Sequence, residues 1–122
     1  MKNIVIIEDD KNTQKIYYDA LVSKGHKLTQ FFSGDVAMFA IKQAKPDLIL
    51  LDIMLPGDKN GFDILEELKA DPDLEHVPVL VLTNLDTEEK AAKEIGVADY
   101  VVKANISLES LLAKINMYLM SS

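Results

Sequence analysis

Residues 48–52 read LILLD, four aliphatic side chains in a row followed at once by an aspartate. A continuous apolar run is typical of a strand buried on both faces of a parallel sheet, because a half-exposed strand alternates apolar and polar residues. Residues 4–7 (IVII) and 79–82 (VLVL) have the same character. Residues 27–32 and 100–102 are weaker candidates, which we expect nearer the edges of the sheet. The sequence therefore predicts five strands.

Five segments with the apolar spacing of helices alternate with these strands. Such alternation indicates an α/β fold with helices on both faces of a parallel sheet. Right-handed crossovers favour a flavodoxin-like (βα)5 architecture, a doubly wound five-stranded sheet with strand order 2-1-3-4-5. Asp86 is expected to cap the fourth helix and Ser107 the last. The expected apolar stripes are Ile16, Tyr17, Ala20 and Leu21 in the first helix; Val36, Ala37, Ala40 and Ile41 in the second; Ile64, Leu65 and Leu68 in the third; and Leu108, Leu111, Leu112, Ile115 and Leu119 in the last.

The length and composition of the chain exclude several classes of protein. A chain of 122 residues has room for one core, so we expect a single domain over residues 1–122. Twenty acidic residues against thirteen basic ones, all lysine, give a formal net charge of −7, which argues against binding to nucleic acid or an anionic membrane. Cysteine is absent, and the apolar runs are too short for a signal peptide or a membrane span. We therefore expect a cytoplasmic protein.

Polar residues follow the strands at the edge where ligands bind in such sheets. Glu8 and Asp9 follow the first strand, and Asp52 follows the third. Thr83 ends the fourth strand and Lys103 follows the fifth. Because neighbouring strands lie about 4.8 Å apart, the three acids are expected to crowd together and to repel one another unless a cation intervenes. A hard divalent ion with oxygen ligands, Mg²⁺, suits this place.

The same residue types are suited to phosphoryl transfer. A metal ion and the Lys103 ammonium can neutralise the charge of a transferring phosphoryl group, while the Thr83 hydroxyl donates a hydrogen bond to it. An aspartate can itself be the nucleophile and form an acyl phosphate. Asp52 stands alone at the end of the central strand and is the candidate nucleophile, whereas Glu8 and Asp9 are neighbours suited to holding the metal.

Four motifs occur in the order and near the spacing of a known family. They are residues 6–10 (IIEDD), 50–57 (LLDIMLPG), 81–83 (VLT) and 99–103 (DYVVK). Together they resemble the receiver domain of response regulators in two-component signalling systems, of the chemotaxis-regulator type. The resemblance covers essentially the whole chain.

The resemblance implies a role for each acid. Asp52 would accept a phosphoryl group from a sensor histidine kinase or a histidine phosphotransfer protein. Glu8, Asp9, Asp52 and the backbone carbonyl of Met54 would hold Mg²⁺. The protein would catalyse its own phosphorylation and slow dephosphorylation, rather than turn over a separate substrate. Slow loss of phosphate is expected because Met54 and Leu85 stand where the family often has polar residues that orient the hydrolytic water.

The resemblance also implies a switch. Thr83 would hydrogen-bond the phosphoryl group, Lys103 would pair with it, and Tyr100 would be the switch aromatic. Movement of Thr83 would then repack the face formed by the fourth helix, the fifth strand and the fifth helix. The expected partner of this face is a downstream effector protein or a fused output domain, and a homodimer, if one forms, would use the same face.

The sequence also departs from the family pattern after Lys103, in the loop at residues 58–60, at Asn84, and in the length of the stretch that follows Thr83. Ala104 follows Lys103 where the family usually has a proline with a cis peptide; a cis bond before another residue costs about 2.5–4 kcal/mol, so the peptide is either trans or strained. The stretch from Thr83 to Gly96 is shorter than usual, so the fourth helix is expected to start late or to be short.

Other functions are compatible with parts of the pattern. A pseudo-receiver would keep the fold and the acids but signal by protein binding without phosphate. An aspartyl-nucleophile phosphatase requires a second aspartate where Met54 stands, and a flavin-binding module requires a phosphate-cradling loop after the first strand. Residues 56–67 match part of an EF-hand loop, but the position of its first ligand is Pro56; a turn into the third helix is favoured. Asp10 is expected to cap the first helix.

Overall fold

The computed structural model describes residues 2–35 and 38–120. Its five strands form one parallel sheet in the order β2-β1-β3-β4-β5, which confirms the predicted topology. The weaker strand candidates, β2 and β5, lie at the two edges as expected. The strands are β1 Asn3–Ile7, β2 Lys27–Phe31, β3 Leu48–Leu51, β4 Val79–Thr83 and β5 Asp99–Val102. The helices are α1 Lys11–Ser23, α2 Met38–Gln43, α3 Gly61–Ala70, α4 Glu89–Ile95 and α5 Leu108–Met120, and a 3₁₀ turn occupies Lys103–Asn105.

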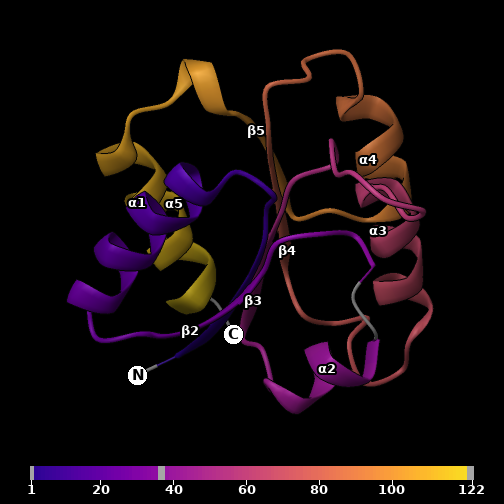
Figure 1. The fold of residues 1–122 in the computed structure, drawn as a ribbon, viewed down its shortest axis with the longest axis horizontal. Helices are drawn as coiled ribbons and strands as arrows, with labels where there is room; N and C mark the ends of the chain where they lie inside the picture. Colours follow the sequence, from indigo (N-terminus) through magenta and orange to yellow (C-terminus); the bar gives the residue numbers. More distant parts are fainter. Residues whose placement is uncertain (1, 36–37, 121–122) are drawn as a thin grey trace.

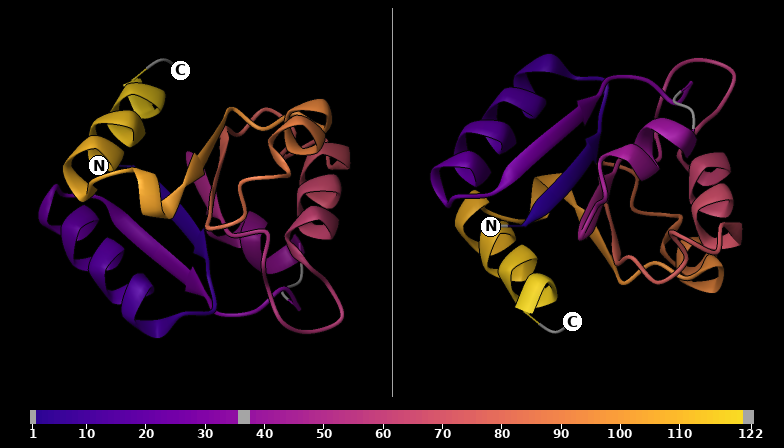
Figure 2. Two further views of the ribbon diagram at one scale, coloured as in Figure 1. Left: turned by 90° about the horizontal axis from the view of Figure 1, so that it is seen from above. Right: turned by 90° about the horizontal axis from the view of Figure 1, so that it is seen from below.

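Helices cover both faces of the sheet. Figure 1 shows α1 and α5 on one face and α2, α3 and α4 on the other, and the two views in Figure 2 show the same three layers from above and below. Successive side chains of a strand point to opposite faces. Ile4 and Ile6 accordingly pack in the core under α1 and α5, whereas Val5 and Ile7 pack in the core under the other helices. The central strands are almost entirely apolar because both of their faces are buried; the exceptions, Asn3 and Thr83, stand at strand ends.

The helices differ from the sequence expectations in their details. Ile16 is 54% exposed and Leu108 is 39% exposed, so neither belongs to the buried stripe predicted for its helix. The predicted positions Val36 and Ala37 of the second helix lie outside the described residues, and α2 is described from Met38.

The fourth helix begins late. It starts at Glu89 and has 7 residues, which confirms the expectation of a late or short helix. The predicted cap at Asp86 is wrong: Glu88 is the N-cap residue, and it makes no side-chain capping bond. The fifth helix does begin as predicted, because the Ser107 hydroxyl accepts a hydrogen bond from the backbone N–H of Ser110 at 3.1 Å. In the described part of the chain, no helix has the length and hydrophobicity to span a membrane.

Candidate functional site

The backbone ladder continues past the ends of the central strands and places the acids. The backbone N–H of Glu8 donates to the carbonyl of Phe31 at 3.0 Å, and that of Asp52 donates to the carbonyl of Ile7 at 3.0 Å. The first residue after β1 and the first after β3 are therefore fixed side by side at the carboxyl edge of the sheet. This is the point at which strand order reverses, where open α/β sheets bind their ligands.

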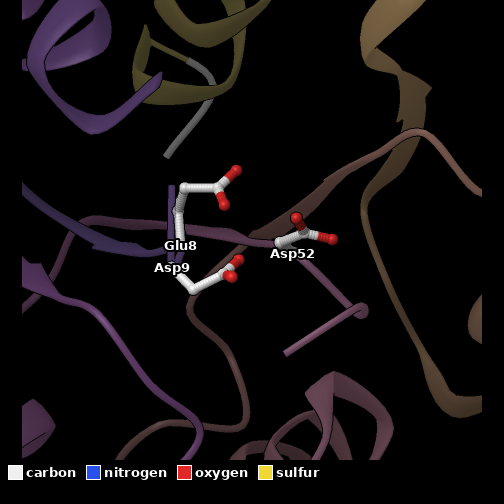
Figure 3. A group of neighbouring side chains, drawn as sticks. All are labelled: Glu8, Asp9 and Asp52. Carbon is white, nitrogen blue, oxygen red and sulfur yellow. The ribbon is translucent and has the colours of Figure 1, made fainter. Parts of the chain in front are cut away.

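Three carboxylates meet at this edge. Glu8, Asp9 and Asp52 each offer one oxygen, and these oxygens all lie within 4.8 Å of one another. Glu8 and Asp52 are buried, whereas Asp9 is exposed. Figure 3 shows Glu8 and Asp9 reaching from the end of β1 towards Asp52. The structure thus brings together the three acids that the sequence placed there.

Lys103, from the C-terminal part of the chain, reaches the same site. It opens the 3₁₀ turn after β5, and its ammonium donates to Asp52 Oδ2 at 2.9 Å and to Glu8 Oε1. No peptide bond among the described residues is cis, so Lys103 makes these contacts with a trans peptide before Ala104. The alanine in place of proline does not keep the lysine from the carboxylates.

The other oxygen of each buried carboxylate accepts a backbone N–H. Asp52 Oδ1 accepts from Met54 at 2.9 Å, and Glu8 Oε2 accepts from Asp10 at 3.0 Å. Burial raises the pKa of Glu8, although the hydrogen bond from Lys103 opposes the shift. Burial also disfavours the charged form of Lys103, but its hydrogen bonds to the two carboxylates outweigh this and raise the lysine pKa. The site therefore favours a protonated lysine.

The net charge of this group favours the binding of a divalent cation. Three carboxylates and the Lys103 ammonium sum to a charge of −2 when all are ionised, and in the described part of the chain Lys103 is the one lysine paired with them. A carboxylate oxygen can accept more than one partner, so the hydrogen bonds above do not exhaust the oxygens. Carboxylate oxygens at this spacing are a donor set that suits Mg²⁺. We conclude that the residues present fit the ion that the sequence predicts.

Thr83 at the end of β4 and Tyr100 on β5 share a hydrogen-bond partner. Thr83 is buried at the end of β4, and its hydroxyl accepts a hydrogen bond from the backbone N–H of Leu85 at 3.3 Å. Tyr100 is buried on β5, and its hydroxyl donates to the backbone carbonyl of Leu85. The two residues predicted to form the switch are thus joined through the main chain of Leu85, a contact that the sequence did not predict.

The side chains of Asp10 and Asn60 cap helices and are not part of the acidic group. The Asp10 carboxylate accepts from the backbone N–H groups of Asn12 and Thr13, as the N-cap of α1. Asn60 caps α3 in a capping box with Asp63, which agrees with the expected turn into the third helix.

Gly61 brings α3 against the backbone that carries Asp52. Its N–H donates to the carbonyl of Ile53 at 3.1 Å. A Cβ at this position would lie 2.2 Å from the Ile53 Cα and 2.5 Å from the Asp52 carbonyl oxygen. Only a residue without a side chain allows this contact, and no local signal in the sequence predicts it.

We expect Gly61→Ala to lower the free energy of unfolding by about 3 kcal/mol or more, at or above the upper end of the usual cost of overpacking, because backbone atoms cannot yield as a side chain can. Gly25→Ala is the matched control: its Cβ would meet no atom within 4 Å, and its φ of +90° adds a strain of about 1–2 kcal/mol. Urea denaturation of both variants measures the difference. Equal losses would contradict the assignment of Gly61 as a packing contact.

The fold and the site define a flavodoxin-like α/β protein with an acidic crevice and a lysine at the switch point of its sheet. Residues 4–116 match the response regulator receiver domain family, and the chain belongs to that family. It is 33% identical over 115 residues to protein PilH of Pseudomonas aeruginosa, covering 92% of this chain and 93% of PilH.

The fold of this chain is also similar to those of two solved response regulator structures. The Mn²⁺-bound form of the response regulator Rcp1 has a TM-score of 0.82 and 31% sequence identity, with 100% of this chain and 97% of that chain covered. The phosphorylated cyanobacterial phytochrome response regulator RcpA has a TM-score of 0.83 and 32% identity, with coverage of 98% and 94%.

Proposed function

We propose that this receiver domain accepts a phosphoryl group on Asp52 from a sensor histidine kinase or a histidine phosphotransfer protein, in a reaction that depends on Mg²⁺. The observation that carries the proposal is the group formed by Glu8, Asp9 and Asp52, with Lys103 paired to Asp52. The similar structures add support, because Rcp1 binds Mn²⁺ and RcpA is phosphorylated.

Each residue has a part in the proposed reaction. A carboxylate oxygen of Asp52 attacks the phosphorus of a phosphohistidine, an O–P bond forms, and the P–N bond to the histidine breaks. Glu8, Asp9, Asp52 and the backbone carbonyl of Met54 would hold Mg²⁺, which neutralises charge on the phosphoryl oxygens when bound. Lys103 and the Thr83 hydroxyl stabilise the same oxygens by charge and by hydrogen bonding.

The output of the reaction is a change in the face formed by α4, β5 and α5. If the Thr83 hydroxyl turns to the phosphoryl group, it gives up the N–H of Leu85, whose carbonyl is the partner of Tyr100. A shift of Leu85 then changes the position of the Tyr100 ring in β5. We propose that a downstream effector, a fused output domain or a second copy of the chain binds this face in one of its two arrangements.

Acetyl phosphate, a small phosphoryl donor, tests the proposal without knowledge of the kinase. In the presence of Mg²⁺, intact-mass spectrometry should show one added phosphoryl group, and EDTA should prevent it. No adduct would favour a pseudo-receiver, and release of phosphate without an adduct would favour a phosphatase. After removal of the donor, the adduct should decay slowly, because Met54 and Leu85 offer no polar side chain to orient water; fast decay would contradict this part of the proposal.

A further inference from the structure

Gln14 is a polar side chain buried beneath the acidic group. It lies in the first turns of α1 and is 1% exposed, in a helix whose other buried residue is Leu21. Its side chain reaches the carboxyl ends of β1 and β2, directly below the turn that carries Glu8 and Asp9. A buried amide is retained at little cost only when it is fully hydrogen-bonded.

The Gln14 amide holds the main chain of Glu8. Its Nε2 donates to the carbonyl of Phe31 at 2.9 Å and to that of Glu8 at 3.1 Å, with a longer contact to Ile6 at 3.4 Å. The Phe31 carbonyl also accepts the backbone N–H of Glu8. The N–H of Glu8 is therefore bonded to the Phe31 carbonyl and the C=O of Glu8 to the Gln14 amide, and these two partners are hydrogen-bonded to each other.

Gln30 fixes which way the Gln14 amide points. The Gln30 Nε2 on β2 donates to Gln14 Oε1 at 2.9 Å and, more weakly, to the Gln14 carbonyl at 3.4 Å. With its oxygen engaged by Gln30, the Gln14 NH₂ group faces the carbonyls of Phe31 and Glu8. The hydrogen bonds therefore all run one way: the Gln30 amide donates to the Gln14 side chain, and the Gln14 amide donates to the Glu8 carbonyl.

From these contacts we propose that Gln14 is a positioning residue for the metal site: it sets the backbone of the turn that presents the Glu8 and Asp9 carboxylates to Asp52. The inference rests on the proposed function, because it assumes that these carboxylates bind Mg²⁺. Gln14 itself does not contact the acidic oxygens. It acts through the main chain of Glu8, as outer groups of metal sites orient the ligands that touch the metal.

Loss of the Gln14 amide should displace the Glu8 and Asp9 carboxylates. Without it, the buried carbonyl of Glu8 lacks its donor, and an unpaired buried carbonyl is unfavourable. The turn then relaxes towards water, and the carboxylate oxygens of Glu8 and Asp9 no longer hold their spacing to Asp52. Asp10 still caps α1, so the helix itself keeps its N-terminus.

The test compares three variants for Mg²⁺ affinity, measured by isothermal titration calorimetry. Gln14→Met keeps the length of the side chain but removes its donors, and it should weaken Mg²⁺ binding by about tenfold or more. Gln30→Met makes the same change one step further from Glu8 and should weaken binding by less than about threefold. Ile115→Val destabilises the core under α5 and should leave the affinity unchanged, so that a general loss of stability is separated from positioning.

A second readout does not depend on the metal. In the metal-free protein, NMR should show faster amide hydrogen exchange at Glu8 and Asp10 in Gln14→Met than in Ile115→Val. If Gln14→Met does not fold, Gln14→Asn takes its place; this side chain keeps an amide but is too short to reach the same carbonyls, and it should also weaken Mg²⁺ binding. Unchanged affinity in a folded Gln14 variant, with a wild-type protein that binds Mg²⁺, would overturn the inference alone. A wild-type protein that binds no Mg²⁺ would overturn the proposed metal site and the inference with it.

Discussion

Asp52→Asn should abolish the phosphoryl adduct formed with acetyl phosphate and Mg²⁺. The substitution keeps the size and shape of the side chain but replaces the carboxylate by an amide, which is a poor nucleophile and a weaker ligand for a hard cation. The Asp52 carboxylate accepts from Lys103 with one oxygen and from the Met54 N–H with the other, so its position in the group is fixed. Intact-mass spectrometry measures the result, and isothermal titration calorimetry should show weaker Mg²⁺ binding.

Asp10→Asn is the matched control for this experiment. Asp10 lies beside the acids in sequence, but its carboxylate caps α1, and asparagine is an equally good N-cap residue. The control should form the adduct at the wild-type level. An adduct that persists in Asp52→Asn, or is lost in Asp10→Asn, would assign the phosphoryl group to another residue.

Lys103→Met should lower the free energy of unfolding by about 3–5 kcal/mol in EDTA, the usual cost of removing one partner from a buried ion pair. The side chains of Glu8 and Asp52 are only 4% and 6% exposed, so the variant leaves two buried carboxylates without their lysine. Addition of Mg²⁺ should restore part of the stability, because a bound divalent ion supplies the missing positive charge and stabilises the folded state. Urea denaturation with and without Mg²⁺ measures both effects.

Lys114→Met is the comparison for the lysine. Lys114 pairs with Asp99 at 2.9 Å, but its side chain is 40% exposed, so its loss should cost less than about 1 kcal/mol and should not respond to Mg²⁺. If the two variants lose the same stability, the buried pair at the acidic site contributes no more than a surface pair. If Mg²⁺ stabilises neither the wild-type protein nor Lys103→Met, the acidic group does not bind the ion.

The arrangement of the sheet and the place of the acids could be predicted because they depend on local signals. The runs at 4–7, 48–51 and 79–82 are apolar throughout since both faces of the central strands are covered, and the residue that follows a strand necessarily lies at its carboxyl edge. Glu8, Asp9 and Asp52 were found in this way. Their meeting follows from strand order alone.

The details that could not be predicted depend on contacts between segments far apart in the chain. An apolar residue at position 16 suggested a buried position, yet Ile16 is exposed, and α1 buries Gln14 together with the predicted Leu21. The signal for Gln14 was its spacing with Tyr17 and Leu21, which places it on one helix face, but its partners are carbonyls that no periodicity reveals. The need for glycine at position 61 likewise becomes clear only from its close contact with the backbone of Ile53.

Leu85 has a consequence for how this protein can change over evolution. Its two links, from its N–H to Thr83 and from its carbonyl to Tyr100, use main-chain atoms that nearly every amino acid possesses. Another side chain at this position would keep both hydrogen bonds between β4 and β5, and the constraint on it is its packing against the core, where Leu85 now lies. Under the proposed function, the rate of phosphate loss would then depend on the side chain at position 85, and the link from Thr83 to Tyr100 would depend on its main chain.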